Sequence, residues 1–320
     1  MTQACASVVG AVRLSVALDI DPGIDDALAV ALALHSPEIR LELVTTVAGN
    51  GPLDMTTRNA LRVLHHLGAD DIPVVAGAAK PLRKPFHGAM GYHGHDALGG
   101  IDLPDSPCAA HPGDAVDALH QFAAAQPGER VLVATGPLTN VAQAFQRHPE
   151  LPAMLKEVVI MGGAFGLTRY GTGNETPVAE FNIWQDPDAA EAVFASGASI
   201  SIVGLDVTND PTTALTGGDL ARLRGGTTPT ARMAADITAF ALETHPDCAL
   251  HDPLALAVVL DRTLFDFAHG RLEVHTAADS EMGRTTVRAD SPTSRPAAAV
   301  AAAVDGARFK QMFLSRILED

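Results

Sequence analysis

The chain has 320 residues, of which 47% are hydrophobic and only 4% aromatic, so its core must be built mainly from Ala, Val, Leu and Ile. The 22 basic and 38 acidic residues give a formal charge of −16, which repels phosphate backbones and anionic lipids, and no apolar run reaches the roughly 20 residues that cross a bilayer; neither nucleic acid nor a membrane is an expected partner. The three cysteines, Cys5, Cys108 and Cys248, form no CxxC pair, which predicts neither a disulfide framework nor a zinc site and fits a cytoplasmic location.

Apolar runs rich in β-branched residues alternate with helical patterns along the chain. Residues 1–18 have no basic segment ahead of their apolar part, and we expect an irregular start followed by a first strand at 14–18. Further strands are expected at 41–47, 72–76, 131–134, 158–161 and 200–203, and helices at 27–34, 53–67, 115–125, 138–147 and 189–195. Helices at 219–224, 229–243 and 253–259, strands at 271–275 and 285–287, and a closing helix at 305–318 follow. This order predicts an α/β fold with an open, mostly parallel, Rossmann-like sheet flanked by helices, formed by residues 1–320 as a single domain.

Residues 84–114 form the longest stretch without a clear hydrophobic period. Long ordered loops of this kind are often lids or binding loops, but they are also common as plain surface loops. The stretch contains the segment Tyr92-His93-Gly94-His95-Asp96. Its local sequence leaves the two interpretations open.

Four carboxylates, Asp19, Asp21, Asp25 and Asp26, occur within eight residues after the first strand. Like charges this close raise one another's pKa values unless a cation compensates them, and a hard divalent metal ion is the simplest compensation. Acids at a helix N-terminus would account for Asp25 and Asp26 alone. An EF-hand is excluded because the sixth and twelfth positions counted from Asp19 are not Gly and Glu. The turn therefore predicts a metal site.

Polar residues follow several other strands as well: Asn50, Thr135, Met161 and Asp206. Ligands of open α/β sheets gather at the carboxyl ends of the strands, so we expect the active site at that edge. Two further segments are ambiguous by themselves. His251-Asp252-Pro253 also matches an ordinary helix start, and the amides and acids of residues 174–182 suit either sugar hydroxyls or a polar loop.

Six segments together resemble the nucleoside hydrolase family. They are residues 19–27, 45–50, 134–140, 161–163, 178–182 and 251–253, and they occur in the order that the family has. Six ordered matches make a chance resemblance improbable, although each is weak alone. The resemblance implies a calcium-dependent enzyme that hydrolyses the N-glycosidic bond of ribonucleosides to give ribose and a free nucleobase. It also implies a homodimer or homotetramer.

The resemblance further implies a role for each matched position. Asp21, Asp26, Asp252 and the backbone carbonyl of Thr135 would hold the calcium ion. Asp21 would also act as general base toward the attacking water, and His251 would protonate the departing base. The ribose would be bound by Asp25 at the 2'-hydroxyl, by Asn50, Asn174, Glu180 and Asn182, by Met161 alongside, and by His93 near the 5'-hydroxyl.

The six segments contain no Lys or Arg, whereas phosphate groups are normally bound by basic side chains or by a glycine-rich anion site. This favours a neutral nucleoside over a nucleotide. Two alternatives remain: a metal-dependent phosphohydrolase that uses Asp19 and Asp21, and a ribose- or nucleoside-binding protein without catalytic activity.

The chain departs from the family pattern at two places. Ala97 stands where the glycine-rich loop usually has Gly, which leaves the shape of this loop open. Trp184 is the only tryptophan, so the paired-tryptophan contact of the purine-preferring branch is not expected and the base preference is open. Phe240 and His245 are candidate base contacts, and Phe240 also suits a place in the core.

Overall fold

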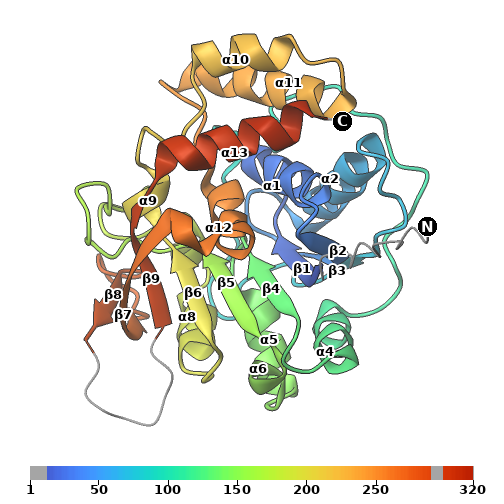
Figure 1. Cartoon of the computed structure of the whole chain (residues 1–320). Helices are drawn as coiled ribbons and strands as arrows, with labels where there is room; N and C mark the ends of the chain where they lie inside the picture. Colours follow the sequence, from blue (N-terminus) through green and yellow to red (C-terminus); the bar gives the residue numbers. More distant parts are fainter. Residues whose placement is uncertain (1–12, 290–297, 320) are drawn as a thin grey trace, which may run out of the picture.

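The computed structural model describes residues 13–289 and 298–319, which are built around one nine-stranded sheet (Figure 1). The strands are β1 (Leu14–Ile20), β2 (Ile39–Thr46), β3 (Val74–Ala76), β4 (Val131–Ala134), β5 (Glu157–Met161), β6 (Ile200–Val203), β7 (Phe265–Val274), β8 (Thr285–Arg288) and β9 (Ala298–Val304). Their order across the sheet is β3-β2-β1-β4-β5-β6-β9-β7-β8. All pairs from β3 to β9 are parallel, whereas β7 is antiparallel to both β9 and β8. The expected open, mostly parallel α/β sheet is confirmed.

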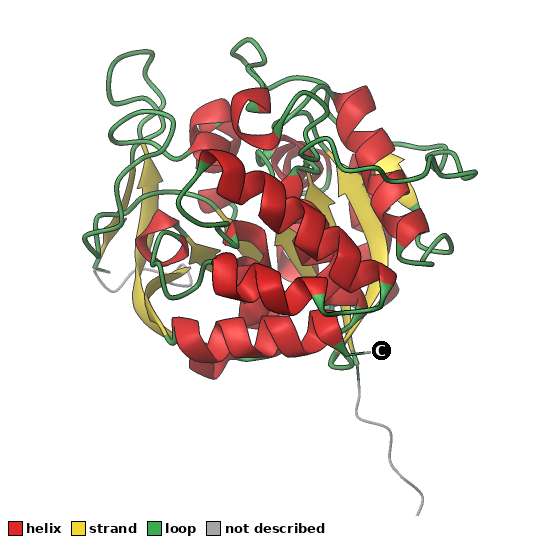
Figure 2. Ribbon diagram, turned by 90° about the horizontal axis from the view of Figure 1, so that it is seen from above, coloured by secondary structure: helices red, strands yellow, loops and turns green. Residues whose placement is uncertain are grey.

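Helices cover both faces of the sheet (Figures 1 and 2). They are α1 (Ile24–Leu34), α2 (Leu53–His66), α3 (Met90–His93), α4 (Ala115–Ala125), α5 (Thr139–Arg147), α6 (Leu151–Met154), α7 (Phe181–Gln185), α8 (Pro187–Phe194), α9 (Leu205–Thr208), α10 (Gly217–Arg224), α11 (Pro229–Thr244), α12 (His251–Leu260) and α13 (Gly306–Leu318). One core cluster joins α1, α2, α11, α12 and α13 to the sheet, and a second joins α4, α5 and α8 to its other face. None of the described helices is long and apolar enough to cross a membrane.

The alternation of side chains along β1 explains why both faces are covered. Val16, Leu18 and Ile20 belong to the first core cluster, and Ala17 belongs to the second. Successive residues of a strand point to opposite faces, so a strand that is apolar at every position needs helices on both sides. β4 and β6 are buried along their whole length for the same reason.

The structure differs from the sequence-based prediction at several element boundaries. β1 continues to Ile20, so Asp19 lies inside the strand, and α1 begins at Ile24, so its first turn contains Asp25 and Asp26. The strand β9 was missed, because its sequence AAVAAAV is rich in Ala, which has a low intrinsic strand preference; its place between β6 and β7 overrides that preference. The short helices α3, α6, α7 and α9 were also missed, since four or five residues carry too little periodicity.

Parallel pairing brings the candidate residues to one edge of the sheet. Asp19 is level with Thr45 on β2 and with Ala134 on β4. The segments that follow these three positions therefore leave the sheet together, with Asp21 and Thr135 among them. The predicted convergence at the carboxyl ends of the strands is what the register produces.

Candidate active site

The turn between β1 and α1 is the centre of the candidate site. Asp21 lies in this turn, and Asp25 and Asp26 lie in the first turn of α1; all three are buried. Gly23 has no room for a side chain, because a Cβ atom there would lie 2.5 Å from Nδ1 of His93. The backbone N–H of Gly23 donates to the Asp26 carboxylate (2.9 Å), which satisfies one of the free N–H groups at the start of the helix.

A fourth carboxylate reaches this turn from a distant part of the chain. Asp252 is buried in the first turn of α12, and an oxygen atom from each of Asp25, Asp26 and Asp252 lies within 4.8 Å of the others. One oxygen of Asp21 accepts a hydrogen bond from the backbone N–H of Asn50 (2.7 Å). The other, Oδ1, is buried without a hydrogen-bond partner among the described residues, and so is Oδ1 of Asp25. A buried carboxylate oxygen without a hydrogen-bond partner lowers the stability of the folded protein. Both atoms therefore suggest a bound ligand.

Burial is the main cause of the raised pKa values in this cluster. It raises the pKa of Asp25 to about 8, with the charge of Asp26 as the second cause. Burial also raises the pKa of Asp21 and of Asp252 well above the usual value, and the neighbouring carboxylates add to both shifts. The nearest basic group is the His93 ring, whose Nδ1 lies 3.8 Å from Asp25. Among the described residues, no Lys or Arg forms an ion pair that would compensate the four acids.

These residues fit a hard divalent cation. The cluster offers buried carboxylate oxygens, two of them without a partner, and oxygen atoms are the ligands that Ca²⁺ and Mg²⁺ prefer. The carbonyl of Thr135, an expected ligand, accepts a hydrogen bond from Nδ2 of Asn182 (2.6 Å) and keeps a second lone pair. The Thr135 hydroxyl donates to Asp26 (2.9 Å). The site could therefore hold a divalent metal ion.

A cavity of about 290 Å³ opens above the acidic cluster. All of the residues that the sequence predicts as ribose contacts line it: Asp25, Asn50, His93, Met161, Asn174, Glu180 and Asn182. The predicted metal ligands Thr135 and Asp252 line it as well, together with the predicted proton donor His251. Asp21 and Asp26 are not part of the lining and are buried beside it. The structure thus brings the predicted site residues together.

Two of the predicted sugar contacts also hold the loop that carries them. The buried Glu180 carboxylate caps α7 by accepting from the backbone N–H groups of Asn182 (2.8 Å) and Ile183 (3.1 Å), and it also accepts from the N–H of Gly163 after β5 (2.9 Å). Oδ1 of Asn174 accepts from the N–H of Phe181 (2.9 Å). The same side chains thus order the loop and line the cavity, so the binding of sugar hydroxyls by residues 174–182 stays a prediction.

Burial lowers the pKa of two of the histidines that line the cavity, His251 and His93. Nδ1 of His251 lies 2.8 Å from the hydroxyl of Thr208, and burial lowers the His251 pKa to about 4. Nδ1 of His93 accepts a hydrogen bond from the backbone N–H of Ile24 (3.3 Å), so its Nε2 carries the proton. Burial, then the neighbouring His251 and His245, lower the pKa of His93 to about 3.

The lining of the cavity also includes aromatic and further polar side chains. Tyr92 and His245 line it, with ring centroids 4.4 Å apart, and Asn209 and Asp247 lie there as well. Phe240 does not line the cavity. Its ring packs against the loop at Gly99, where an added Cβ would lie 2.7 Å from Phe240 Cδ1. Sequence reasoning missed Tyr92, although it precedes the quoted His93, and it had no signal for Asn209 or Asp247.

The glycine-rich loop, whose shape the sequence left open, has a left-handed backbone at Ala97. Ala97 has φ of 62°, in the left-handed region where a side chain costs roughly 1–2 kcal/mol. Its neighbours Gly94 and Gly99 also have positive φ values, of 83° and 70°. The Ala at this position is therefore accommodated at a conformational cost, with its side chain buried.

Two strand-end acids serve the structure and do not line the cavity. Asp19 accepts hydrogen bonds from Thr45 (2.5 Å) and Asn140 (2.8 Å), and burial raises its pKa to about 6. Asp206 accepts from the backbone N–H groups of Phe165 (2.7 Å) and Leu167 (2.6 Å), which shapes the loop after β5. A phosphohydrolase that needs Asp19 beside Asp21 as a reactive pair does not match this arrangement.

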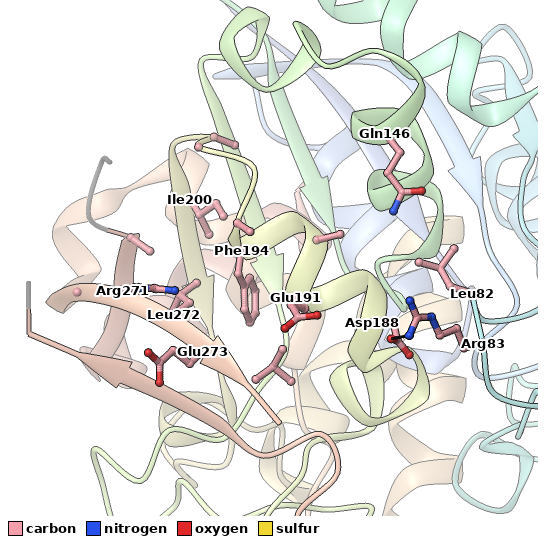
Figure 3. Close-up of a pocket in the computed structure, with 17 residues that line it drawn as sticks. Leu82, Arg83, Gln146, Asp188, Glu191, Phe194, Ile200, Arg271, Leu272 and Glu273 are labelled. Atoms are coloured by element: carbon pink, nitrogen blue, oxygen red, sulfur yellow. Dashed lines mark ion pairs between the residues drawn. The ribbon is translucent and has the colours of Figure 1, made fainter. Parts of the chain in front are cut away.

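A larger groove elsewhere contains none of these residues. It has a volume of about 1090 Å³ and runs beside α8, with Phe194, Arg271 and Glu273 among its lining residues (Figure 3). Arg83 and Asp188 form an ion pair there (3.3 Å). It lacks a buried cluster of unpaired polar groups, which is the feature that marks the smaller cavity as the candidate site.

The fold and the site together define an α/β enzyme whose buried carboxylates and amides surround a small cavity at the carboxyl edge of a parallel sheet. The sequence matches the family described as inosine-uridine preferring nucleoside hydrolase over residues 16–311. The chain belongs to this family and is a hydrolase of the N-glycosyl bond of ribonucleosides.

Known relatives agree with this assignment over nearly the whole chain. The pyrimidine-specific ribonucleoside hydrolase RihA of Salmonella arizonae is 40% identical over 312 residues, which cover 95% of this chain and 98% of that protein. RihA of Citrobacter koseri is 39% identical over the same shares. Among solved structures, the purine-preferring ribonucleoside hydrolase of Gardnerella vaginalis has a TM-score of 0.88 at 34% identity, covering 95% of this chain and 98% of that one. The plant nucleoside hydrolase PpNRh1 has a TM-score of 0.88 at 32% identity, covering 96% and 100%.

Proposed function

We propose that this chain hydrolyses neutral ribonucleosides with a calcium ion held by Asp21, Asp26, Asp252 and the carbonyl of Thr135. The main support is the group of buried carboxylates that have no basic partner and lie directly beside a cavity of about 290 Å³. When bound, the ion would supply positive charge that orients and acidifies the attacking water. All four proposed ligands offer oxygen atoms, which favours calcium over the softer transition metals.

The chain's own residues would then carry the remaining steps. Asp21 is proposed to take the proton of the attacking water through Oδ1, which has no hydrogen-bond partner within residues 13–289 and 298–319, while the N–H of Asn50 donates to its second oxygen. Asp25 is proposed to bind the ribose 2'-hydroxyl. Glu180 and Asn182 would bind other hydroxyls and stabilise the positive charge that develops on the sugar as the glycosidic bond breaks.

The remaining ribose contacts are proposed for Asn50, Asn174, Met161 and His93, all of which line the cavity. Nε2–H of His93 is free to donate, because its Nδ1 already accepts from the backbone, and a 5'-hydroxyl could accept that hydrogen bond.

His251 is proposed to deliver a proton to the departing base. The hydroxyl of Thr208 holds its Nδ1 (2.8 Å), which leaves Nε2 for the leaving group. Proton donation matters most for bases that leave poorly. His251→Ala should therefore slow natural nucleosides more than p-nitrophenyl riboside, and an equal loss on both would remove this role.

We propose a preference for pyrimidine nucleosides. The RihA relatives at about 40% identity are named pyrimidine-specific, whereas the purine-preferring relative shares 34%. Tyr92 and His245 line the cavity with ring centroids 4.4 Å apart and are proposed to contact the base.

Ribose release from uridine, cytidine, inosine and adenosine, each with and without a calcium chelator, tests the proposal. Release from uridine and cytidine that stops on chelation is the expected result. Hydrolysis of p-nitrophenyl phosphate in place of all nucleosides, or tight nucleoside binding without release, would overturn it.

Three properties of the whole protein complete the proposal. We expect residues 1–320 to fold as a single domain, and the chain to assemble as a homodimer or homotetramer, which light scattering on the purified protein will test. A reducing cytoplasm suits the free thiols of Cys108 and Cys248.

A further inference from the structure

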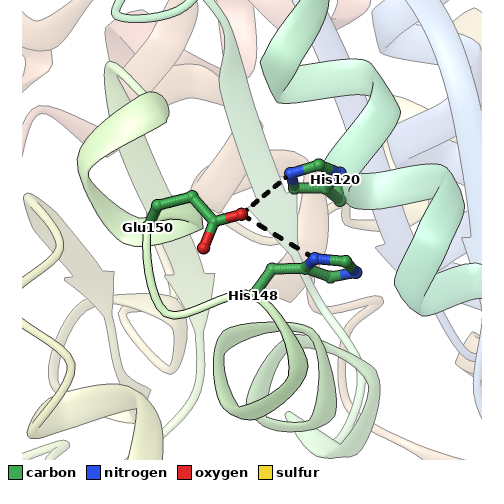
Figure 4. Close-up of side chains that lie close together, drawn as sticks. All are labelled: His120, His148 and Glu150. Atoms are coloured by element: carbon green, nitrogen blue, oxygen red, sulfur yellow. Dashed lines mark hydrogen bonds and ion pairs between the residues drawn. The ribbon is translucent and has the colours of Figure 1, made fainter.

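A second cluster of metal-binding side chains lies on the surface, away from the acidic site. His120 comes from α4, His148 directly follows α5, and Glu150 directly precedes α6. One ligand atom from each lies within 4.8 Å of the other two. Nε2 of His120 is 3.1 Å from Oε1 of Glu150, and Nδ1 of His148 is 3.8 Å from the same oxygen (Figure 4). None of the three lines the active-site cavity.

The backbone at these positions is held by the fold. Leu119 and Phe122 on α4 are buried in the same core cluster as Leu151 on α6, so the elements that carry His120 and Glu150 are packed together. The N–H of His148 donates to Ala144 at the end of α5 (2.9 Å), and its carbonyl accepts from Leu151 (2.9 Å). Side chains on packed elements can present a preorganised set of ligands.

His148 has a second contact that is typical of metal-binding histidines. Its Nε2 lies 3.3 Å from Oδ1 of Asp117, on the side of the ring opposite to the nitrogen that faces Glu150. Arg147 holds Asp117 by an ion pair (3.2 Å). A carboxylate that accepts the other N–H of a histidine fixes its tautomer and leaves the first nitrogen free for a metal. This contact is independent of the three-residue cluster itself.

The distances in the cluster suit a small ion after a modest change in ring angle. Two ligand atoms in a tetrahedral site with bonds of 2.0–2.1 Å are about 3.3 Å apart, a value between the 3.1 and 3.8 Å observed here. The two rings stack with centroids 4.0 Å apart and an angle of 14°. Since an imidazole binds metal in its own plane, one ring has to rotate about its Cβ–Cγ bond. The side chains of His120 and His148 are 26% and 22% exposed, which leaves room for this rotation.

Other surface histidines lack this combination. His65 pairs with Asp70 (2.8 Å) and His275 pairs with Asp279 (2.9 Å), and neither belongs to a three-residue cluster among the described residues. Two imidazole nitrogens with one carboxylate are a ligand set that Zn²⁺, Ni²⁺ and Cu²⁺ accept, whereas Ca²⁺ selects oxygen atoms.

We propose that His120, His148 and Glu150 form a second metal site, which binds a divalent transition-metal ion of the zinc class. Water completes the coordination. The ion connects α4 to the start of α6, so it stabilises this corner of the fold and takes no part in nucleoside hydrolysis.

Calorimetric titration of the full chain with Zn²⁺ in saturating Ca²⁺ tests this site. The proteins are the parent, His120→Ala, His148→Ala and the matched control His65→Ala, which also removes a helix-borne histidine paired with a carboxylate. We expect one zinc ion per chain in the parent and the control, and at least a tenfold weaker affinity in both cluster variants. A loss below tenfold in either variant, or no zinc binding by the parent, overturns the proposal.

A measurement on the parent protein covers the case in which a variant fails to fold. Diethyl pyrocarbonate modifies accessible histidines, and mass spectrometry of the peptides locates the modification. Zinc should protect His120 and His148 while His65 stays reactive, and equal modification with and without zinc overturns the proposal. Both experiments depend on the histidines alone, so they can be read whether or not the acidic cluster binds calcium.

Discussion

Asn140 allows a quantitative test of how the floor of the active site is held together. Its side chain is fully buried and makes three hydrogen bonds between separate segments. Nδ2 donates to Oδ1 of Asp19 on β1 (2.8 Å) and to the carbonyl of Thr46 on β2 (3.0 Å). Oδ1 accepts from the backbone N–H of Ala78, just after β3 (2.8 Å). One amide thus ties β1, which leads to the acidic turn, to β2 and to the segment that follows β3.

The loss of unfolding free energy in Asn140→Ala depends on which other hydrogen bonds the three partners of Asn140 keep. Asp19 and the Thr46 carbonyl each retain one other hydrogen bond, so each loss costs about 1 kcal/mol. The N–H of Ala78, a half-buried residue, has no other hydrogen bond among the described contacts, and leaving such a donor unpaired costs at most about 1–3 kcal/mol. The sum is about 3–5 kcal/mol, a large part of the roughly 5–15 kcal/mol that stabilises a typical domain.

Chemical unfolding by urea, followed by circular dichroism, measures this loss. The control is Gln146→Ala, which removes an exposed amide from the same helix and should change the free energy of unfolding by no more than about 0.5 kcal/mol. A loss below about 1 kcal/mol for Asn140→Ala, with an unchanged urea dependence, would show that these hydrogen bonds do not hold the sheet edge.

Three further predictions concern the site itself. Asp252→Asn should weaken calcium binding at least tenfold, about 1.4 kcal/mol. It should also raise the melting temperature of the chelator-treated protein, because it removes a buried acid that repels its neighbours. Calorimetry measures the calcium affinity and thermal melts measure the stability; an unchanged calcium affinity would exclude Asp252 as a ligand. Thr208→Val removes the hydroxyl next to His251 with little change of volume. We expect about a tenfold lower kcat for uridine and a smaller loss for p-nitrophenyl riboside. Steady-state kinetics measures both, and an unchanged kcat for uridine would contradict the prediction. Tyr92→Ala should raise KM for uridine several-fold, since the Tyr92 ring lines the cavity beside His93 and His245; an unchanged KM would exclude Tyr92 as a substrate contact.

Local sequence was enough to predict the class of fold and the chemical character of the site. Apolar β-branched runs form strands wherever they are buried on both faces, so the alternating order of strands and helices can be predicted without tertiary information. The acidic turn was recognisable because like charges at Asp21, Asp25 and Asp26 need compensation. The order of six short motifs was enough to indicate the protein family.

The tertiary structure alone shows where each acid lies. Asp19 and Asp21 are two residues apart and chemically identical, yet Asp19 lies within β1 and is held by Thr45 and Asn140, whereas Asp21 lies past the strand beside the cavity. Asp252 joins the cluster from more than 200 residues away.

The same holds for Tyr92 facing His245, for Ala-rich β9 inside the sheet, and for His120 beside Glu150. These relations depend on which segments the fold brings together. A local pattern reports how a residue relates to its neighbours in the chain, whereas burial, strand register and contact with a distant side chain are properties of the packed whole.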